Sequence, residues 1–584
     1  MDIVSQGKAV KLIGRLLDMT SCTQPIIKTA PQKPAVDPRP LRAPLPRATP
    51  ESVGVPGGRL RAFLRALDED RRIDMHGVMI LRGGKVICEG SFGAYRGDTW
   101  HTTFSMCKSI TCLAVGILVD DGLLSTDERL ADIFKSRARR LNIAMMKNIT
   151  VEHLLTMSTG VLFNEAGAMT ETDWVKSFLE SGRKFEAGKD FSYNSLNTYM
   201  LSAIVREKTG KSLSAFLNER LFGPMGIEQY FWETCPKGIE RGGWGLYLRM
   251  EDAAKLGQLV LDYGVWNGRQ LVSREWIERA SHTRIKPPDN LGDFDYGYQM
   301  WTQRDRDAFL FNGMFGQNVI GYRGTGIVVV SYAGNNEFFQ LSDYFKALGR
   351  YFGPDFRPSD KPLLPNPIGD MRLRRTEKRL GTAFYEKRFS APARRRACEA
   401  LNGVSYSFLH RETAGVGLMP LMLQGVQNNY TKGVDAVAFS ARADGFFVLV
   451  EEGGETREFR VGFGAPAYTD VSFAGEPYRV GTTGRFSRDE DGAPVLILRF
   501  SFIETAHTRI LKVFYADGER ARFEFSERPG RAYVQLSLET TFGERRTNRL
   551  LEPILGKAEA DILDYRLRIA FEPEATGRRH EKQD

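Results

Sequence analysis

The sequence predicts an α+β domain, in which helices flank an antiparallel sheet, followed by an all-β C-terminal domain of barrel or sandwich type. Three observations predict this fold class. Strand-like runs lie at both ends of residues 51–353, with helix-like segments between them. A proline-rich break at 354–367 separates this part from the rest. From 402 to 541, alternating apolar runs recur between glycine and acidic turns, which is typical of antiparallel strands.

Each element of the first domain follows from its local pattern. Apolar residues at helical spacing predict a helix over 59–68, and two β-like runs around Gly83-Gly84 predict a hairpin over 76–90. Residues 105–280 are rich in helix-like segments, with helix starts near Thr150 and Ser212. The closing elements are three short strands and a helix, at 309–312, 318–322, 327–332 and 338–352. Strands from both ends predict a single sheet completed by the two ends of the domain.

The whole chain divides at its proline-rich segments. Eight prolines between residues 24 and 50 exclude regular helix there and predict an extended leader. No fixed-period repeat occurs. The predicted parts are a leader, an α+β domain, a linker, a β-rich domain and a charged tail, at 1–50, 51–353, 354–394, 395–575 and 576–584.

A Ser-x-x-Lys tetrapeptide, Ser105 to Lys108, opens the most apolar stretch of the chain, residues 110–119. Residues three apart share a helix face, so the lysine amine can reach the serine hydroxyl. Burial disfavours an ammonium ion and would leave Lys108 able to accept a proton. The same spacing at Ser5–Lys8 and Ser181–Lys184 has no comparable apolar helix after it. The pattern therefore predicts Ser105 as a nucleophile, against the alternative of a capping serine beside a surface-directed lysine.

Composition excludes several other classes of protein. Of the 584 residues, 42% are hydrophobic and 26% are charged, as in ordinary globular proteins. The net charge is +9, but the sequence contains no basic motif interleaved with aromatic residues. Nucleic-acid binding is therefore not expected. Six scattered cysteines without Cys-x-x-Cys spacing predict neither a disulfide framework nor a zinc site. No metal or other cofactor is expected, and neither a signal peptide nor a membrane span is evident, which predicts a cytoplasmic protein.

Serine and lysine need a proton relay and donors for an oxyanion, and two later segments offer them. In the first, Tyr193 is the candidate relay, as a partial phenolate near the lysine, and either Ser195 or Asn197 would orient Lys108. The alternative is a buried aromatic residue at a loop–helix junction.

The second segment runs Phe311-Asn312-Gly313-Met314 on a predicted edge strand. Glycine there would let a substrate approach the backbone, and the Met314 amide could pair with the Ser105 amide as an oxyanion hole. An ordinary glycine-containing β-turn is the alternative.

In this order the three segments resemble the serine β-lactamase and penicillin-binding-protein-like hydrolases. The resemblance is strongest to the class C-like branch with esterases, D-aminopeptidases and 6-aminohexanoate-dimer hydrolases. It covers about residues 51–350, and the stretches 151–160 and 245–252 also look like segments of that family. The resemblance implies Ser105 as acylated nucleophile, Lys108 as base, Tyr193 as proton relay and residues 311–314 as the third motif.

Two departures from the family pattern bear on the substrate. The family's Tyr-x-Asn is here Tyr193-Asn194-Ser195, and Phe311 stands where β-lactamases and D,D-peptidases carry lysine or histidine. A phenylalanine cannot pair with a substrate carboxylate, which would be costly to desolvate unpaired. The sequence therefore predicts hydrolysis of small esters or uncharged amides and poor β-lactamase or D,D-carboxypeptidase activity.

Three alternatives remain open at this point. An acyltransferase on the same scaffold would deliver the acyl group to an alcohol or amine. A true β-lactamase or D-peptidase would contradict the inference from Phe311. A binding protein without catalysis would keep the fold and use the β-rich half for recognition. The oligomeric state, the pathway and the role of the C-terminal domain do not follow from the sequence.

Overall fold

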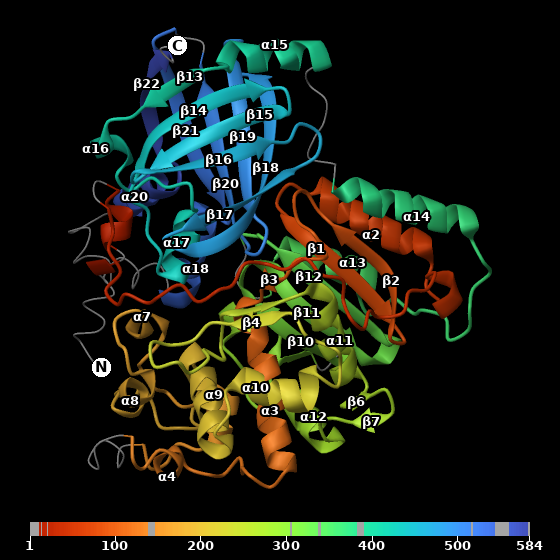
Figure 1. The fold of residues 1–584 in the computed structure, drawn as a ribbon. Helices are drawn as coiled ribbons and strands as arrows, with labels where there is room; N and C mark the ends of the chain where they lie inside the picture. The colour runs from red at the N-terminus through yellow and green to blue at the C-terminus, as the bar shows by residue number, and fades with distance from the viewer. Residues whose placement is uncertain are drawn as a thin grey trace.

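The computed structural model describes residues 11–581 apart from 13, 20–21, 138–145, 304–305, 337–339, 341, 382–389, 516–517 and 543–559. The Ser-x-x-Lys spacing at Ser5–Lys8 and the expected helix start at Phe338 lie outside the described residues. The chain forms two large bodies, a mixed α/β domain and a strongly curved β-sheet domain, which lie one above the other in Figure 1.

A seven-stranded antiparallel sheet forms the centre of the first domain, in the order β2-β1-β12-β11-β10-β9-β8. Its strands are Met75–Arg82, Lys85–Ser91, Asp295–Tyr296, Trp301–Gln303, Ala308–Gly313, Gln317–Tyr322 and Ile327–Ala333, numbered β1, β2 and β8 to β12. The N-terminal hairpin pairs directly with β12, with Val78 opposite Ser331. The expectation that both ends of the domain complete one sheet is therefore confirmed.

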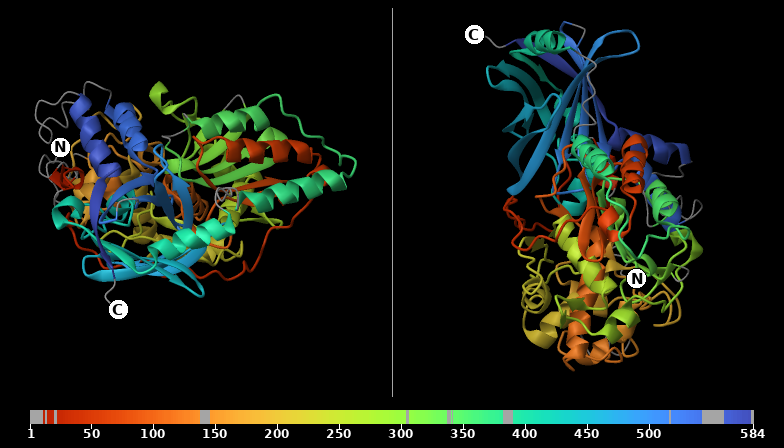
Figure 2. Two further views of the ribbon diagram at one scale, coloured as in Figure 1. Left: turned by 90° about the horizontal axis from the view of Figure 1, so that it is seen from above. Right: turned by 90° about the vertical axis from the view of Figure 1, so that its right-hand side faces the viewer.

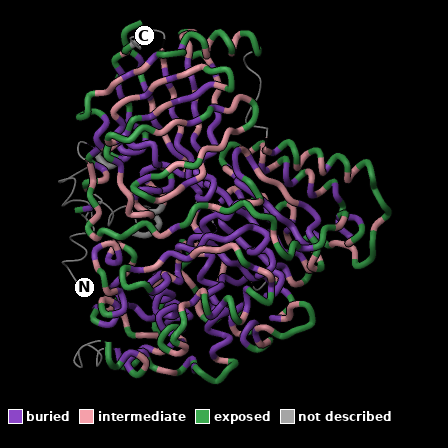
Figure 3. The backbone as a smooth tube through the Cα atoms, in the orientation of Figure 1, coloured by how far each residue is buried: buried purple, intermediate pink, exposed green. Residues whose placement is uncertain are grey.

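Helices cover both faces of this sheet, because alternate side chains of each strand point to opposite faces. One face packs against α2 (Gly57–Glu69), α13 (Asp343–Phe352) and α14 (Pro367–Leu380). The other packs against α3 (Cys107–Asp120) and α11 (Met250–Leu261). Figure 3 shows the buried residues concentrated in and around this sheet.

Further helices build a lobe around α3. Among the described residues, the other helices of this lobe are α4 (Leu130–Ile133), α6 (Val151–Leu155), α7 (Glu165–Ala168), α8 (Trp174–Leu179), α9 (Ser195–Thr209), α10 (Leu213–Leu217) and α12 (Arg274–Ala280). Twelve of the fourteen residues of α3 are buried, so this helix is apolar on all sides and lies inside the lobe. The expected helix starts at Thr150 and Ser212 are the caps of α6 and α10.

One prediction about this sheet is wrong. The strand that carries the third motif, β10, is not an edge strand, because it lies between β11 and β9. Its pairing with β9 ends at Leu310, however, whereas its pairing with β11 continues to Gly313. The segment 311–313 is therefore open on one side only, and that side meets the turn that contains Ser105.

The C-terminal domain is a single ten-stranded antiparallel sheet that curls into a near-barrel, which Figure 2 shows from above. Its order is β16-β15-β14-β13-β22-β21-β20-β19-β18-β17, and a bridge links Gly462, just after β16, to Thr483 of β18. The strands β13 to β21 are Val404–Ser407, Val434–Arg442, Gly445–Glu452, Glu455–Val461, Ala467–Phe473, Glu476–Arg488, Pro494–Phe502, Thr508–Phe514 and Arg520–Arg528. The predicted α+β domain followed by an all-β barrel-like domain is thus confirmed.

Two boundaries differ from the expected division. The charged residues at 574–581 are not a tail but strand β22 (Glu574–Glu581), which lies between β13 and β21. Its small residues, Ala575 and Gly577, are buried, and a Cβ atom at Gly577 would lie 2.8 Å from the Phe523 ring, whereas Glu574, Thr576 and Arg578 are exposed and form the outer face. Within the expected linker, helix α14 packs on α2 and on β2 and buries Leu373 and Leu380.

The C-terminal domain also contains helices. They are α15 (Ala391–Leu401), α16 (His410–Thr413), α17 (Leu421–Gln427), α18 (Arg531–Phe542) and α20 (Ala560–Phe571). In Figure 1, α17 and α18 lie at the end of the near-barrel that faces the catalytic domain.

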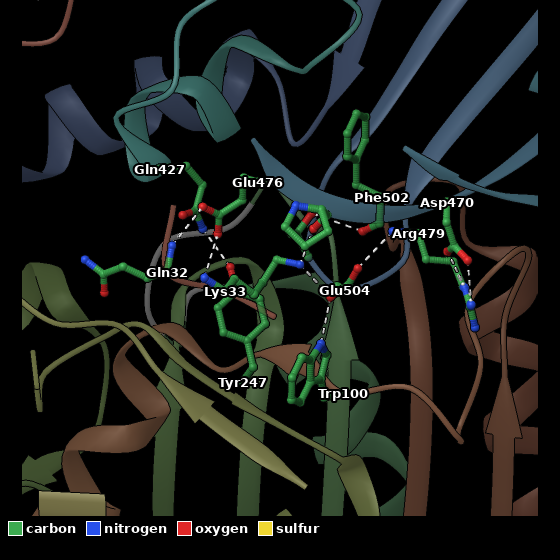
Figure 4. Close-up of polar contacts among 12 residues, drawn as sticks. Gln32, Lys33, Trp100, Tyr247, Gln427, Asp470, Glu476, Arg479, Phe502 and Glu504 are labelled. Atoms are coloured by element: carbon green, nitrogen blue, oxygen red, sulfur yellow. Dashed lines mark hydrogen bonds and ion pairs between the residues drawn. The ribbon is translucent and has the colours of Figure 1, made fainter. Parts of the chain in front are cut away.

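The proline-rich leader runs between the two domains in an extended conformation without regular helix from 22 to 49. Figure 4 shows Lys33 of this leader between the domains, beside Glu504 and Glu476. The Lys33 ammonium lies 2.9 Å from a Glu504 carboxylate oxygen, and both side chains are almost fully buried. The leader is therefore a structural part of the contact between the domains.

No helix among the described residues is long and apolar enough to cross a membrane. All six cysteines lie in the described part of the chain and are free.

Candidate active site

Ser105 lies in a 3₁₀ turn, Phe104–Met106, which leads directly into the buried helix α3. The preceding strand β3 (His101–Thr102) pairs with β5 (Leu246–Leu248), and the Thr103 amide donates a 2.8 Å hydrogen bond to the Leu246 carbonyl. Ser105 is partly exposed, whereas its neighbours Phe104 and Met106 are buried. The turn therefore presents one hydroxyl toward the surface on an otherwise fixed backbone.

Lys108 lies one turn further along and is almost fully buried. Its Nζ atom is 2.7 Å from Ser105 Oγ, 2.9 Å from Ser195 Oγ and 2.7 Å from the Gly243 carbonyl oxygen. Burial lowers the pKa of Lys108 to about 8, because the charged ammonium loses its hydration. An amine with this pKa is partly neutral near pH 7 and can accept the Ser105 proton.

Tyr193 approaches the same serine from the start of α9. Its hydroxyl is in hydrogen-bonding contact with Ser105, and the Lys108 Nζ atom lies 4.9 Å from its ring centroid. Burial nevertheless raises the pKa of Tyr193 above its usual value. The phenol, and not the partial phenolate expected from the sequence, is therefore the resting form of this side chain.

The two candidates for orienting Lys108 occupy different environments. Ser195 contacts the lysine, as described above, whereas the Asn197 side chain accepts a 2.8 Å hydrogen bond from Thr159 and contacts Met157. Of the two, only Ser195 is in a position to orient the amine. Asn194, between Tyr193 and Ser195, caps α9 through the Leu196 amide at 2.9 Å and so fixes the loop that carries both.

The third motif meets the nucleophile turn at Gly313. A Cβ atom at this glycine would lie 2.3 Å from the Thr103 carbonyl oxygen and 3.1 Å from the Met106 amide nitrogen. Only glycine allows this approach, which brings the backbone of Met314 beside that of Ser105. The amides of these two residues are accordingly the available donors for an oxyanion.

The side chains of the third motif do not provide a cation. Phe311 is 1% exposed and packs into the apolar core around α3. Asn312 points to the opposite face of the strand and donates a 2.7 Å hydrogen bond to the Asn318 side chain. Both residues therefore support the strand, and among the described residues Lys108 supplies the amine that contacts Ser105.

Two contributors to the site were missed from the sequence. Gly243, which supplies a carbonyl to Lys108, packs so closely on α9 that a Cβ atom would lie 2.7 Å from the Ser195 carbonyl oxygen. Glu165 accepts a 2.8 Å hydrogen bond from the Ser195 amide, and its charge acts to raise the pKa of Lys108. The Arg-Gly-Gly-Trp run at 241–244 was the available signal for the first, and no local pattern indicates the second.

The arrangement is a nucleophile, a partly neutral amine base, a phenol and two backbone donors. Among the described residues, no group of three His, Cys, Asp or Glu side chains is placed to hold a metal ion. The alternative tetrapeptide at Ser181 does not form such a site, because Ser181 Oγ contacts the Gly182 carbonyl and the Lys184 amine lies near Ser192.

Comparison with known proteins finds relatives of the first domain. The family model described as Beta-lactamase matches residues 60–342. A 6-aminohexanoate-dimer hydrolase of Paenarthrobacter ureafaciens is 25% identical over 47% of this chain and 77% of its own length. Penicillin-binding protein 4 of Amycolatopsis lactamdurans is 27% identical over 30% of this chain and 44% of its own length.

Among solved structures, the D-amino acid amidase of Ochrobactrum anthropi is 16% identical, with a TM-score of 0.41 over 55% of this chain and 98% of that one. The family match covers the sheet, α3 and the segments that carry Tyr193 and Met314. Residues 60–342 therefore form a domain of the beta-lactamase and penicillin-binding-protein-like family.

Proposed function

We propose that this protein hydrolyses esters or uncharged amides of small molecules through an acyl-enzyme on Ser105. The observation that carries the proposal is the buried Lys108 amine, which lies 2.7 Å from Ser105 Oγ and has a pKa lowered to about 8. A buried, partly neutral amine at that distance is what activation of a serine hydroxyl requires.

In the first step, Ser105 Oγ attacks the substrate carbonyl and its proton passes to the Lys108 amine. The amides of Ser105 and Met314 bind the oxyanion of the tetrahedral intermediate. The Tyr193 phenol gives its proton to the departing alcohol or amine, and the Lys108 ammonium returns a proton to the phenolate. A water molecule then attacks the acyl-enzyme by the same route in reverse, which releases the acid and restores Ser105.

The class of substrate follows from Phe311. This buried side chain stands where β-lactamases and D,D-peptidases carry a cation, and it offers no partner for a substrate carboxylate. Esters and uncharged amides have no such carboxylate to desolvate. The relative named 6-aminohexanoate-dimer hydrolase, which is similar over 77% of its length, also supports hydrolysis as the reaction.

Two measurements test the proposal. Intact-mass spectrometry after a serine-directed fluorophosphonate should show one adduct on the wild type and none on Ser105→Ala. An adduct that survives the substitution would place the nucleophile elsewhere. Hydrolysis of p-nitrophenyl butyrate should be faster than hydrolysis of a cephalosporin, and the opposite order would contradict the inference from Phe311.

Transfer of the acyl group to an acceptor other than water is tested in the same assay. Products are analysed with and without a simple alcohol such as methanol. Formation of the methyl ester at the expense of the acid would identify an acyltransferase, and unchanged acid release would identify a hydrolase. No acylation by any activated ester would favour a binding protein.

A further inference from the structure

Each of the two proposed oxyanion donors has one neighbouring residue with a left-handed backbone. Phe104 immediately precedes Ser105 and has a φ of 46°, and Phe315 immediately follows Met314 and has a φ of 64°. For a bulky residue this conformation is strained, at a cost of about 1–3 kcal/mol each, and it persists only where the surroundings hold it. The Ser105 amide belongs to the peptide bond that follows Phe104, so its direction depends on the Phe104 backbone, and Phe315 shapes the turn that begins at Met314.

The two rings pack against each other and against the C-terminal domain. Phe104 and Phe315 meet edge to face, with ring centroids 5.0 Å apart, and are 2% and 0% exposed. The Tyr533 ring, from the first turn of α18, lies 4.5 Å from Phe315. The His507 ring, from the turn between β19 and β20, lies 5.4 Å from Phe315 and 6.3 Å from Phe104. The catalytic domain thus presents two strained residues to two rings of the other domain.

His507 acts here as an uncharged packing surface. It is fully buried, and neither ring nitrogen has a hydrogen-bond partner among the described residues. Burial lowers the pKa of His507 to about 3, so the ring is neutral at ordinary pH. His101, which also acts to lower the pKa of His507, has its own pKa lowered by burial to about 4 and is neutral as well.

The turn that carries His507 is fixed to the segment that leads into the nucleophile. Glu504 accepts hydrogen bonds from the Trp100 indole at 2.7 Å and from the Lys33 ammonium at 2.9 Å, as Figure 4 shows. The Glu504 backbone carbonyl also accepts a 2.9 Å hydrogen bond from the Thr102 amide. Thr102 is three residues before Ser105, so the leader, the near-barrel and strand β3 are held together at this point.

A second link reaches the other donor. The Tyr533 hydroxyl lies 3.0 Å from the Met314 sulfur atom. Tyr533 is 3% exposed. The C-terminal domain therefore contacts the catalytic domain on both sides of the proposed oxyanion hole.

We propose that the C-terminal domain positions the oxyanion hole. Through His507 and Tyr533 it holds Phe104 and Phe315 in their left-handed conformations, which aims the Ser105 amide and keeps the turn at Met314 in place beside it. His507 and Tyr533 are positioning residues, because they act through the phenylalanines and touch no reacting atom. The inference rests on the proposed function, since it assigns a task to donors that only an acyl-transfer reaction uses.

The test compares truncation with a substitution that keeps the ring. Tyr533→Ala and His507→Ala are expected to lower kcat for p-nitrophenyl butyrate about 10- to 100-fold, with KM changed less than about threefold, because oxyanion donors act mainly in the transition state. Tyr533→Phe and His507→Phe should restore most of the rate. If either alanine variant fails to fold, Tyr533→Leu fills the volume without a ring and is expected to lose the rate as well.

Tyr406→Ala is the matched control. Tyr406 is a buried tyrosine of the same domain that packs on Phe523 in the core of the near-barrel. Its truncation should lower Tm and leave kcat per folded molecule unchanged. A purely structural role for Tyr533 and His507 would make their variants behave like this control.

Two results separate the inference from the function on which it rests. If the wild type is acylated on Ser105 while the alanine variants keep kcat within about threefold, the positioning role is wrong and the proposed function stands. If the wild type is not acylated on Ser105, the proposed function fails and the inference fails with it. Loss of kcat in the alanine variants, recovery in the phenylalanine variants and no loss in Tyr406→Ala together support it.

Discussion

The pH dependence of catalysis follows directly from the burial of Lys108. Only the neutral amine can accept the Ser105 proton, and burial lowers the pKa of Lys108 to about 8. The neutral fraction is about 0.09 at pH 7 and about 0.91 at pH 9, so kcat/KM should rise about tenfold between these values. Activity is thus lost as the pH falls through about 8, because the amine becomes protonated.

The charge of Glu165 provides a way to move this midpoint. Glu165 is a lesser influence on Lys108 than burial, and it raises the pKa of the amine by stabilising the ammonium. Glu165→Gln removes the charge and keeps an oxygen that can accept the hydrogen bond from the Ser195 amide. The pKa of Lys108 should fall by about one unit or less, and the midpoint of kcat/KM should move to lower pH by the same amount.

The assay is the initial rate of p-nitrophenyl butyrate hydrolysis from pH 6 to 9.5, followed at the isosbestic wavelength of the product. The rate of Ser105→Ala is subtracted as background. Glu128→Gln is the matched control, because its carboxylate pairs with Lys208 at 2.6 Å and does not act on Lys108. A flat profile between pH 7 and 9, or a midpoint that rises in Glu165→Gln, would refute the assignment of Lys108 as base.

Three further predictions concern the other parts of the site. Tyr193→Phe should lower kcat at least about 100-fold, as expected on loss of a proton relay, with little change in Tm, measured by stopped-flow acylation and by calorimetry. Gly313→Ala should lower kcat about 100-fold, because the new Cβ would lie 2.3 Å from a carbonyl oxygen of the nucleophile turn, whereas Gly324→Ala has open space and should leave kcat unchanged. Lys33→Met or Glu504→Gln alone should each cost about 3–5 kcal/mol in the free energy of unfolding, because one buried charge loses its partner. The double variant, measured by urea denaturation, should recover most of that loss, and a double variant as unstable as the sum of both would contradict this account.

Much of the fold could be predicted from local patterns. The helix at 59–68, the hairpin at 76–90 and the strands at 318–322 and 327–332 agree closely with α2, β1–β2, β11 and β12. These elements have strong apolar periodicity, which is a property of consecutive residues. Strand β22 was missed because its residues are mostly charged on the outer face, and only pairing with β13 and β21 gives it a partner.

The site was predictable only in part, for a related reason. Ser105 and Lys108 are three residues apart on one helix, so their approach is local. The roles proposed for Tyr193 and Met314 came from the resemblance to a known family. Only the tertiary structure distinguished Ser195 from Asn197 as the residue that orients Lys108. The prediction that residue 311 lies on an edge strand was wrong. The strands that pair beyond β10 cannot be inferred from the sequence of β10 itself.

The sequence by itself determined the spacing of Ser105 and Lys108, the apolar helix behind them and the presence of phenylalanine at position 311. Only the tertiary structure decided the state of those groups. The pKa of Lys108 is set by all the atoms that exclude water from it, including the Gly243 carbonyl far along the chain. The left-handed residues beside the donors are held by rings from another domain. Burial and strain depend on neighbours that are distant in sequence, and no local pattern records them.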